Sequence, residues 1–357
     1  MPVPVNIFEF EPLARVNVEA TAWDYISGGA EDEITLRENR AAFERTFLRP
    51  RYLVDISERD LSTTVLGTKI PFPLMLCPAG YQKLAHPEGE CETARGASAV
   101  GIPMHLSTVA TRTLEDVARV ATCPLWYQLY MMNDKGINEW LVRRAERSGY
   151  RAIVFTVDAM VTGNRERDKR NELSFAALHV ENLITRTDDA PDKIISATHY
   201  HELPWQENLS WRDVEWLRQR TSLPVVVKGL LTAEDALLAA EHGAAGIVVS
   251  NHGGRQLDGA PATLDVLPEI ADAVGSKMEI YLDGGVRRGA DILKAVALGA
   301  RAVCIGRPYL WGLAADGARG VQRVIEILRA EFDMAMALTG RRNVAELDRS
   351  VIWKPGK

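Results

Sequence analysis

The segment SNHGGRQLDG, residues 250–259, places a histidine three positions before an arginine. The side chain of His252 is an imidazole, a group that ordinarily titrates near neutrality and is the usual general base of enzymes. The guanidinium of Arg255 can bind a carboxylate through two parallel hydrogen bonds. Proton transfer to a neutral histidine creates an imidazolium, which needs a buried anion, and Asp158 is the natural candidate. These residues predict proton abstraction from a small molecule that carries a carboxylate.

Eight short apolar runs, most of them followed by an amphipathic stretch, must position these side chains. They are FPLMLCP (72–78), PMHLS (103–107), LWYQLY (125–130), AIVFTVD (152–158), PVVVKG (224–229), GIVVSN (246–251), EIYLDG (279–284) and AVCIG (302–306). Eight strand and helix pairs predict an α/β fold, a closed (β/α)8 TIM barrel with its chemistry at the carboxyl ends of the strands. An open doubly wound sheet is the alternative, but CPAGYQKL, after the first run, lacks the expected GxGxxG.

The predicted helices carry local start and stop signals. Thr232 can cap the helix that follows the fifth run. Four helices close on a glycine, which permits the left-handed backbone common at helix ends. These glycines are Gly101, Gly149, Gly243 and Gly299.

We expect a single catalytic domain over residues 1–357. Residues 1–70 are predicted to form an N-terminal helical cap and a short hairpin that plugs the other end of the barrel, and residues 71–340 to form the barrel. A connection of about sixty-five residues between the fourth and fifth runs breaks the β-α rhythm. Long irregular connections are often lids, so residues 163–210 are predicted to be a mobile lid.

Polar side chains cluster at the carboxyl ends of the predicted strands. They are Gln128 and Tyr130 on the third, Thr156 and Asp158 on the fourth, Lys228 on the fifth, Ser250 on the sixth, Asp283 on the seventh and Arg307 after the eighth. A lone residue of this kind is ordinarily a solvated loop residue. Because the strand ends of a barrel converge on one mouth, the whole set predicts a functional site.

Glycine-rich segments follow the last two strands, where barrels commonly bind phosphate. In DGGVRRGADILKA and IGRP, Gly285 and Gly306 permit close backbone approach, and Arg287 and Arg307 can bond phosphate oxygens. Tight turns alone are the alternative explanation for the glycines. A phosphate-bearing cofactor is the sharper prediction.

Several motifs together resemble the FMN-dependent 2-hydroxy acid oxidases and dehydrogenases, among them glycolate, lactate and hydroxymandelate oxidases and mandelate dehydrogenase. Besides SNHGGRQLDG, the motifs are DYISGGAEDE (24–33), AHPEGE (85–90), TVDAMVTGNRERDKRNE (156–172) and LDGGVRRGADILKAVALGA (282–300). The resemblance runs from about residue 7 to 350. Within the family, the sequence most resembles the lactate and hydroxymandelate oxidases.

The resemblance implies FMN as the cofactor, no metal, and a defined set of catalytic and substrate-binding residues. This set is His252, Asp158, Tyr130, Arg255, Arg165 and Tyr25, with Val109 in the substrate pocket. His252 would take the α-hydroxyl or α-carbon proton while Asp158 balances its charge, and the two arginines would clamp the carboxylate.

The resemblance also implies which residues contact FMN. They are Ala79, Gly80, Ser107, Gln128, Thr156, Lys228, Ser250, Asp283, Gly285, Arg287, Gly306 and Arg307. In this assignment the charge of Lys228 stabilises the anionic reduced flavin.

Two positions depart from the glycolate oxidase pattern. Gly80 replaces an alanine, and Val109 replaces a tryptophan. Both changes remove bulk from the expected pocket, which favours a substrate with a larger α-substituent than glycolate, such as lactate or mandelate. The alternative is that Tyr81 or Trp205 refills the space.

The predicted reaction is oxidation of an (S)-2-hydroxy acid with O2 as acceptor, in class EC 1.1.3.-. A dehydrogenase that uses a quinone or another acceptor, and a lactate monooxygenase, are alternatives within enzymes. A catalytically silent flavin-binding or phosphate-binding barrel is the alternative from another class.

Composition limits the partners and the compartment. A formal charge of −6 gives no basic field for nucleic acid, and no apolar run approaches the length of a membrane span. We therefore expect a cytoplasmic protein, assembled as a homotetramer or octamer as in the family. The four cysteines are expected to be inert reduced thiols, and His105 a hydrogen-bonded core residue.

Overall fold

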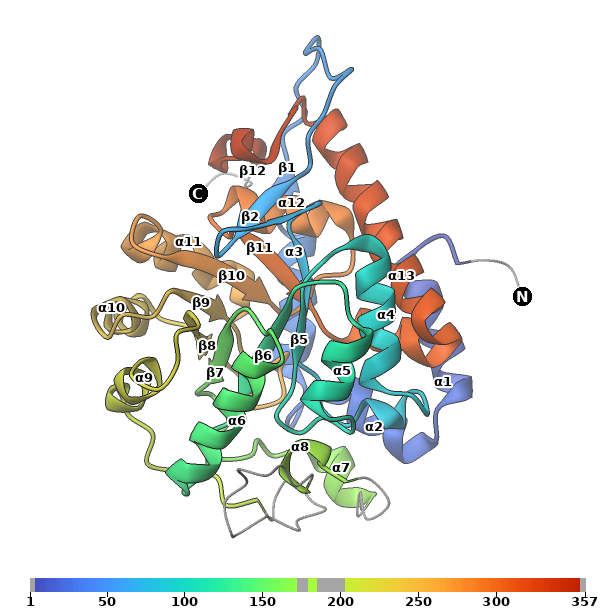
Figure 1. The fold of residues 1–357 in the computed structure, drawn as a ribbon. Coiled ribbons are helices and arrows are strands. Elements are labelled where there is room, and N and C mark those ends of the chain that lie inside the picture. Colours follow the sequence, from blue (N-terminus) through green and yellow to red (C-terminus); the bar gives the residue numbers. More distant parts are fainter. Residues whose placement is uncertain (1–3, 172–178, 185–202, 354–357) are drawn as a thin grey trace.

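The computed structural model describes residues 4–171, 179–184 and 203–353. Eight parallel strands close into a barrel in the order β10-β11-β4-β5-β6-β7-β8-β9, with helices around it (Figure 1). The barrel strands are β4 (Leu74–Leu76), β5 (Met104–Leu106), β6 (Leu125–Leu129), β7 (Ile153–Thr156), β8 (Val225–Leu230), β9 (Gly246–Val249), β10 (Glu279–Asp283) and β11 (Ala302–Ile305). Each lies within or overlaps one of the eight predicted runs. The predicted TIM barrel is confirmed, and the open sheet is excluded.

Almost every residue of these strands is buried, because side chains point alternately into the barrel and toward the surrounding helices. This arrangement explains why the strands read as continuous apolar runs. The register between β7 and β8 pairs Thr156 with Lys228, so polar side chains from neighbouring strands come together where the strands end.

The helices follow the strands as the capping signals indicated. The hydroxyl of Thr232 accepts from the backbone N–H of Asp235, and the four predicted closing glycines all have positive φ. The helices after β4 are α4 (Glu90–Val100), α5 (Leu114–Val120), α6 (Lys135–Arg147), α7 (Glu166–Arg170), α8 (Glu181–Ile184), α9 (Trp211–Arg218), α10 (Ala233–Glu241), α11 (Thr263–Val274), α12 (Gly289–Ala297) and α13 (Arg307–Leu338), with short η2 (Gln82–Leu84), η4 (Val344–Glu346) and η5 (Arg349–Val351). Helix α13 is broken at Asp316 and Gly317, whose backbone angles are not helical.

The first seventy residues contribute to both ends of the barrel. Their elements are η1 (Ile7–Glu9), α1 (Phe10–Asn17), α2 (Ala20–Ser27), α3 (Ile34–Glu44), β1 (Phe47–Leu48), β2 (Thr63–Val65) and β3 (Thr68–Ile70). Helix α2 packs against α7 at the end where the site residues lie, whereas the β2-β3 hairpin is at the opposite end (Figure 1). There Val65 and Ile70 pack with the interior residues Trp126 and Tyr281. Strand β1 pairs with β12 (Ile352–Trp353), which joins the segment before the barrel to the segment after it.

Parts of the predicted lid, residues 172–178 and 185–202, lie outside the described residues. Within the described ranges, no helix combines the length and the apolar character needed to cross a bilayer. All four cysteines are buried and free. Burial raises the pKa of the Cys91 and Cys123 thiols, which agrees with the expected unreactive thiols.

His105 differs from the expectation that it is hydrogen-bonded. It is 1% exposed inside the barrel, its ring stacks on Trp126 at 4.9 Å, and neither ring nitrogen has a hydrogen-bond partner within the described chain. The expectation was wrong because the neighbouring barrel positions are apolar or aromatic, which leaves stacking as the main interaction. Burial, with a contribution from the charge of Lys228, lowers the pKa of His105 to about 3.

We predict that replacing His105 by phenylalanine makes the protein less sensitive to acid. Below pH 6.5 the unfolded chain binds a proton at His105 that the folded protein does not, so the native protein loses stability until the pH approaches 3. At pH 5 this loss is about 2 kcal/mol, and phenylalanine avoids it while keeping the stacking on Trp126. Urea unfolding at pH 7 and pH 5 measures the difference. An equal loss of stability in both proteins on acidification would contradict the assignment.

Candidate active site

A cavity opens at the carboxyl ends of the barrel strands, with about 1100 Å³ of space between protein atoms, including the part continuous with solvent. Most of the predicted site residues line it. They are Tyr25, Ala79, Gly80, Ser107, Val109, Tyr130, Arg165, Lys228, His252, Arg255, Asp283, Gly285, Arg287, Gly306 and Arg307.

Four predicted site residues do not line the cavity but lie directly behind its wall. Gln128 bonds the Ser107 hydroxyl at 3.1 Å on one side and Thr156 at 3.1 Å on the other. Ser250 accepts from the ammonium of Lys228 at 2.9 Å. The fourth, Asp158, lies behind His252. The structure therefore gathers all the predicted residues at one barrel mouth, in two successive layers.

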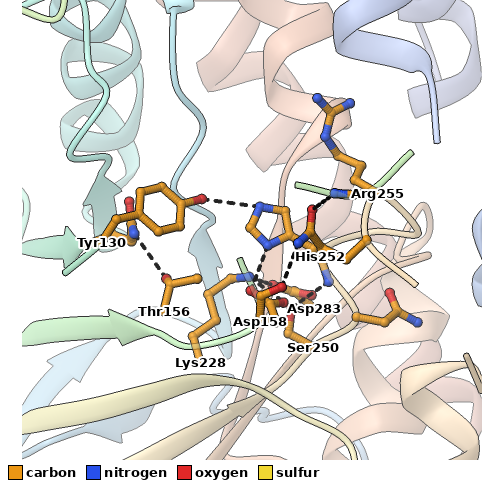
Figure 2. Close-up of polar contacts among 12 residues, drawn as sticks. Tyr130, Thr156, Asp158, Lys228, Ser250, His252, Arg255 and Asp283 are labelled. Atoms are coloured by element: carbon orange, nitrogen blue, oxygen red, sulfur yellow. Dashed lines mark hydrogen bonds and ion pairs between the residues drawn. The ribbon is translucent and has the colours of Figure 1, made fainter. Parts of the chain in front are cut away.

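His252 is held from both sides of its ring. Its Nδ1 lies 2.9 Å from Oδ1 of Asp158, and its Nε2 lies 3.3 Å from the hydroxyl oxygen of Tyr130 (Figure 2). The rings of Tyr130 and His252 are nearly parallel, at 17° and 6.5 Å. Because ionised Asp158 can only accept, it fixes the proton on Nδ1 and leaves the lone pair of Nε2 toward the cavity.

The backbone at His252 is in the left-handed region, with φ of 57°. The sharp turn after β9 is held in part by the backbone N–H of His252, which donates to the Ser250 hydroxyl at 3.1 Å. Since non-glycine residues rarely adopt this conformation, it marks a backbone shaped to aim the imidazole into the cavity.

The protonation states suit a base and its counter-ion. Burial lowers the pKa of His252, although the charge of Asp158 opposes this, so the imidazole is neutral at pH 7. Burial disfavours ionised Asp158, but its interaction with the ring of His252 and the charge of Lys228 outweigh burial, and the pKa of Asp158 is lowered. Burial also disfavours charged Lys228, yet Asp283 and Asp158 raise its pKa. The cavity therefore combines a neutral base with a fixed positive charge.

Two arginines near the base have hydrogen bonds to uncharged groups. Arg255 donates to the carbonyls of Tyr25 and Gly28 at 2.6 and 3.0 Å and lies over the Tyr25 ring. Arg165 donates to the Arg255 carbonyl at 3.2 Å. Burial, and then the charge of Arg165, lowers the pKa of Arg255 to about 10. An anion between the two guanidiniums would offset both the loss of solvation and the repulsion between the two positive charges.

A second pair of arginines, Arg307 and Arg287, lines the same cavity. Arg307 donates to the carbonyls of Ile26, Gly253 and Gly28. Arg287 donates to the Val286 carbonyl and lies over the Trp311 ring. Burial lowers the pKa of Arg307 to about 9 and that of Arg287 to about 10. Among the described residues, neither cation has a carboxylate as a hydrogen-bond partner.

The backbone around the second arginine pair leaves room for a ligand. A Cβ added at Gly306 would meet only the Cβ of Cys77, at 3.9 Å, and α13 begins at the next residue. Helix N-termini favour anions. Within the described chain, Oδ1 of Asp283 is buried without a hydrogen-bond partner. Two half-buried cations, an open glycine and an unsatisfied carboxylate oxygen fit a phosphate ester that also carries hydroxyl groups.

The two positions that depart from the glycolate oxidase pattern touch each other. A Cβ added at Gly80 would lie 2.5 Å from a methyl carbon of Val109, so the valine already fills the space next to the glycine. Tyr81 lines the cavity and packs edge-on against Tyr25 at 6.1 Å. Trp205 packs edge-on against Tyr130 at 5.3 Å. The space gained is therefore smaller than two separate deletions suggest.

Sequence reasoning missed several residues of the site. Three of them line the cavity: Cys77, Gln82 and Cys304. Because alternate residues of a strand share one face, Cys304 could have been assigned to the same face as Gly306. Gln256 holds two loops of the site together, although it lies inside the motif that contains Arg255. Its role depends on a segment almost a hundred residues away, for which the sequence carries no signal.

Fold and site together define a class of protein, a (β/α)8 barrel oxidoreductase with a phosphorylated cofactor beside a histidine base. The FMN-dependent dehydrogenase family matches residues 14–354, and the chain belongs to this family. FMN is accordingly its cofactor, and the residues described above fit it.

Named relatives support the assignment. An L-lactate oxidase of Nostoc sp. is 49% identical over 98% of each chain. A glycolate oxidase of Spinacia oleracea is 47% identical over 97% of this chain and 95% of the relative. Among solved structures, a Pediococcus acidilactici protein described as a lactate oxidase has a TM-score of 0.92 and 40% identity, over 100% of this chain and 96% of that one.

Proposed function

We propose that the protein is an FMN-dependent oxidase that converts an (S)-2-hydroxy acid to the 2-oxo acid while O2 is reduced to hydrogen peroxide. The main support is the neutral imidazole of His252, held by Asp158 and Tyr130 in a cavity that also contains Arg255 and Arg165. A base beside two guanidiniums suits a substrate with a carboxylate next to an acidic proton. The lactate and glycolate oxidases among the relatives agree with this reaction.

In the proposed mechanism, Arg255 and Arg165 bind the carboxylate, with the hydroxyls of Tyr25 and Tyr130 nearby. Nε2 of His252 takes the proton from the α-hydroxyl or the α-carbon, and Asp158 stabilises the imidazolium through Nδ1. The substrate loses two protons and two electrons in total and becomes the 2-oxo acid. FMN, when bound, supplies the two-electron acceptor, and O2 then takes the two electrons and two protons to give hydrogen peroxide.

The same geometry supports an assignment of the cofactor-binding residues. Arg287, Arg307 and the backbone at Gly285 and Gly306 would hold the phosphate, and Asp283 a hydroxyl of the ribityl chain. Ser107 and Lys228, supported from behind by Gln128, Thr156 and Ser250, would hold the polar edge of the ring, with the backbone of Ala79 and Gly80 beside it.

We predict that replacing Arg287 by methionine weakens FMN binding by roughly 10- to 100-fold, because a buried charge-assisted contact to the phosphate is lost. The matched control is Arg288→Met. Arg288 is the next residue, but its guanidinium pairs with Glu331 outside the cavity. Titration of the apoprotein with FMN, followed by quenching of flavin fluorescence, gives both affinities. Equal affinities for the two variants would contradict a phosphate site at Arg287.

The proposed substrates are acids with a larger α-substituent than glycolate, such as lactate or mandelate. Support comes from Val109, a small cavity-lining residue where glycolate oxidases have a tryptophan. The contact of Val109 with Gly80 and the presence of Tyr81 limit the added space. The methyl group of lactate therefore suits the cavity best.

Anaerobic flavin bleaching with glycolate, lactate and mandelate, followed by readmission of O2, tests the proposal. An oxidase yields hydrogen peroxide and the 2-oxo acid. Rapid bleaching with slow reoxidation by O2 but fast reoxidation by a dye indicates a dehydrogenase, and release of carbon dioxide without peroxide indicates a monooxygenase. A preparation that takes up no FMN would support a silent barrel. Preference for glycolate would contradict the substrate size.

We also infer that residues 1–357 act as one domain, because α2 lines the cavity and β1 pairs with β12. A homotetramer or octamer and a cytoplasmic location are proposed from the family resemblance and from the absence of an apolar spanning run in the sequence. Light scattering measures the assembly, and a monomeric mass would contradict it. A fluorescent fusion locates the protein in the cell.

A further inference from the structure

The side-chain amide of Gln256 joins the two loops that carry the arginines of the carboxylate site. Its Nε2 donates to the carbonyls of Asp158 and Val161 at 2.6 and 2.8 Å. Its Oε1 accepts from the backbone N–H of Gly163 and from Nη2 of Arg165, both at 3.1 Å. A primary amide has two donor hydrogens and two acceptor lone pairs, so Gln256 uses its full capacity between these loops.

The two loops are in direct backbone contact at this point. A Cβ added at Gly163 would lie 2.3 Å from the Arg255 carbonyl oxygen and 2.7 Å from Cα of Gln256. The loop after β7 therefore lies directly on the loop after β9, with no side chain between them. Gln256 is the side chain that bonds across this junction to both Asp158 and Arg165.

Electrostatics explains why Arg165 needs such a contact. Arg165 and Arg255 carry like charges in the same cavity, and each would be driven away from the other. The contacts that oppose this repulsion are the Arg255 carbonyl, which accepts from Nε of Arg165, and Oε1 of Gln256, which accepts from Nη2. Both acceptors carry only partial charge, so they orient Arg165 without neutralising it.

We propose that Gln256 is a positioning residue for substrate binding, which holds Arg165 beside Arg255 so that both can reach one carboxylate. This inference rests on the proposed function, because it takes these arginines to be the carboxylate site. Glutamine suits the task, since glutamate in its place would form an ion pair with Arg165 and compete with the substrate.

The experiment compares Gln256→Met, Arg165→Met and the double variant in the FMN-loaded enzyme. The probes are pyruvate and its uncharged amide, and their dissociation constants are read from changes in the flavin absorbance spectrum. Gln256→Met is expected to raise the dissociation constant of pyruvate roughly tenfold and that of the amide less than about twofold, because a hydrogen bond that orients a charged group is lost. In the Arg165→Met background the same change should have little further effect. Leu257→Ala, on the same loop but with an exposed side chain, is the control expected to match the wild type.

The outcomes separate this inference from the proposed function. If Arg165→Met leaves pyruvate binding intact, the carboxylate site itself is wrong. If Arg165→Met weakens pyruvate but Gln256→Met does not, or if Gln256→Met weakens both probes equally, the positioning role is overturned. Additive losses in the double variant also overturn it. Should Gln256→Met fail to fold or to retain FMN, Gln256→Asn, which keeps the amide but is one methylene shorter, replaces it with the same expected results.

Discussion

Replacing His252 by asparagine is expected to lower the rate of flavin reduction by roughly 10²- to 10⁴-fold, while FMN stays bound. Asparagine has no basic nitrogen, so proton abstraction loses its acceptor. It also tolerates positive φ better than other non-glycine residues, and the backbone at His252 has φ of 57°. The expected loss therefore reflects the imidazole and not a distorted turn.

Stopped-flow reduction under anaerobic conditions measures this loss separately from the reaction with O2. The control is His242→Asn, since His242 also bonds a carboxylate, Glu215 at 2.8 Å, but does not line the cavity. This control should reduce its flavin at the wild-type rate. A His252→Asn enzyme that retains more than about a tenth of the wild-type rate would rule out His252 as the base.

Replacing Asp158 by asparagine is expected to lower kcat on the order of 10²- to 10³-fold. The neutral amide no longer stabilises the imidazolium that forms during proton transfer. Its N–H group can also donate to Nδ1 of His252, which moves the ring proton to Nε2 and removes the lone pair that faces the cavity.

The pH dependence gives a second test of Asp158. The charge of Asp158 raises the pKa of His252 against the larger lowering effect of burial, so removing the charge lowers the pKa of His252 further. The acidic limb of kcat/KM should therefore move to lower pH in Asp158→Asn, even as the maximum falls. Asp333→Asn removes an acid that pairs with Arg59 outside the cavity, and its profile should match the wild type. A shift of the acidic limb to higher pH would contradict the assigned pairing.

The features predicted from the sequence are those encoded by local pattern. Strand runs such as AIVFTVD and PVVVKG predicted the barrel because both faces of each strand are buried, which leaves a continuous apolar signature. The polar residues that end these strands could be assigned to one site, since the carboxyl ends of parallel barrel strands must converge. His252, Asp158 and Lys228 therefore followed from pattern and topology together.

Other features depended on contacts between distant segments, which no local pattern specifies. His105 was expected to be hydrogen-bonded, yet its surroundings in the barrel interior offer stacking instead. Gly80 and Val109 seemed to enlarge the pocket independently, but the tertiary structure places one against the other.

From the sequence by itself the barrel could be predicted, which the structure confirms, together with the roles proposed for His252 as a base and for Arg287 and Arg307 as phosphate ligands, because each follows from residue type and strand period. Only the tertiary structure decided how Arg165 is held beside Arg255, since this depends on Gln256 bonding across to a loop more than ninety residues away in the chain. These hydrogen bonds require the loops after β7 and β9 to lie together, and that contact exists only once both strands have paired with β8, which brings distant segments of the chain together.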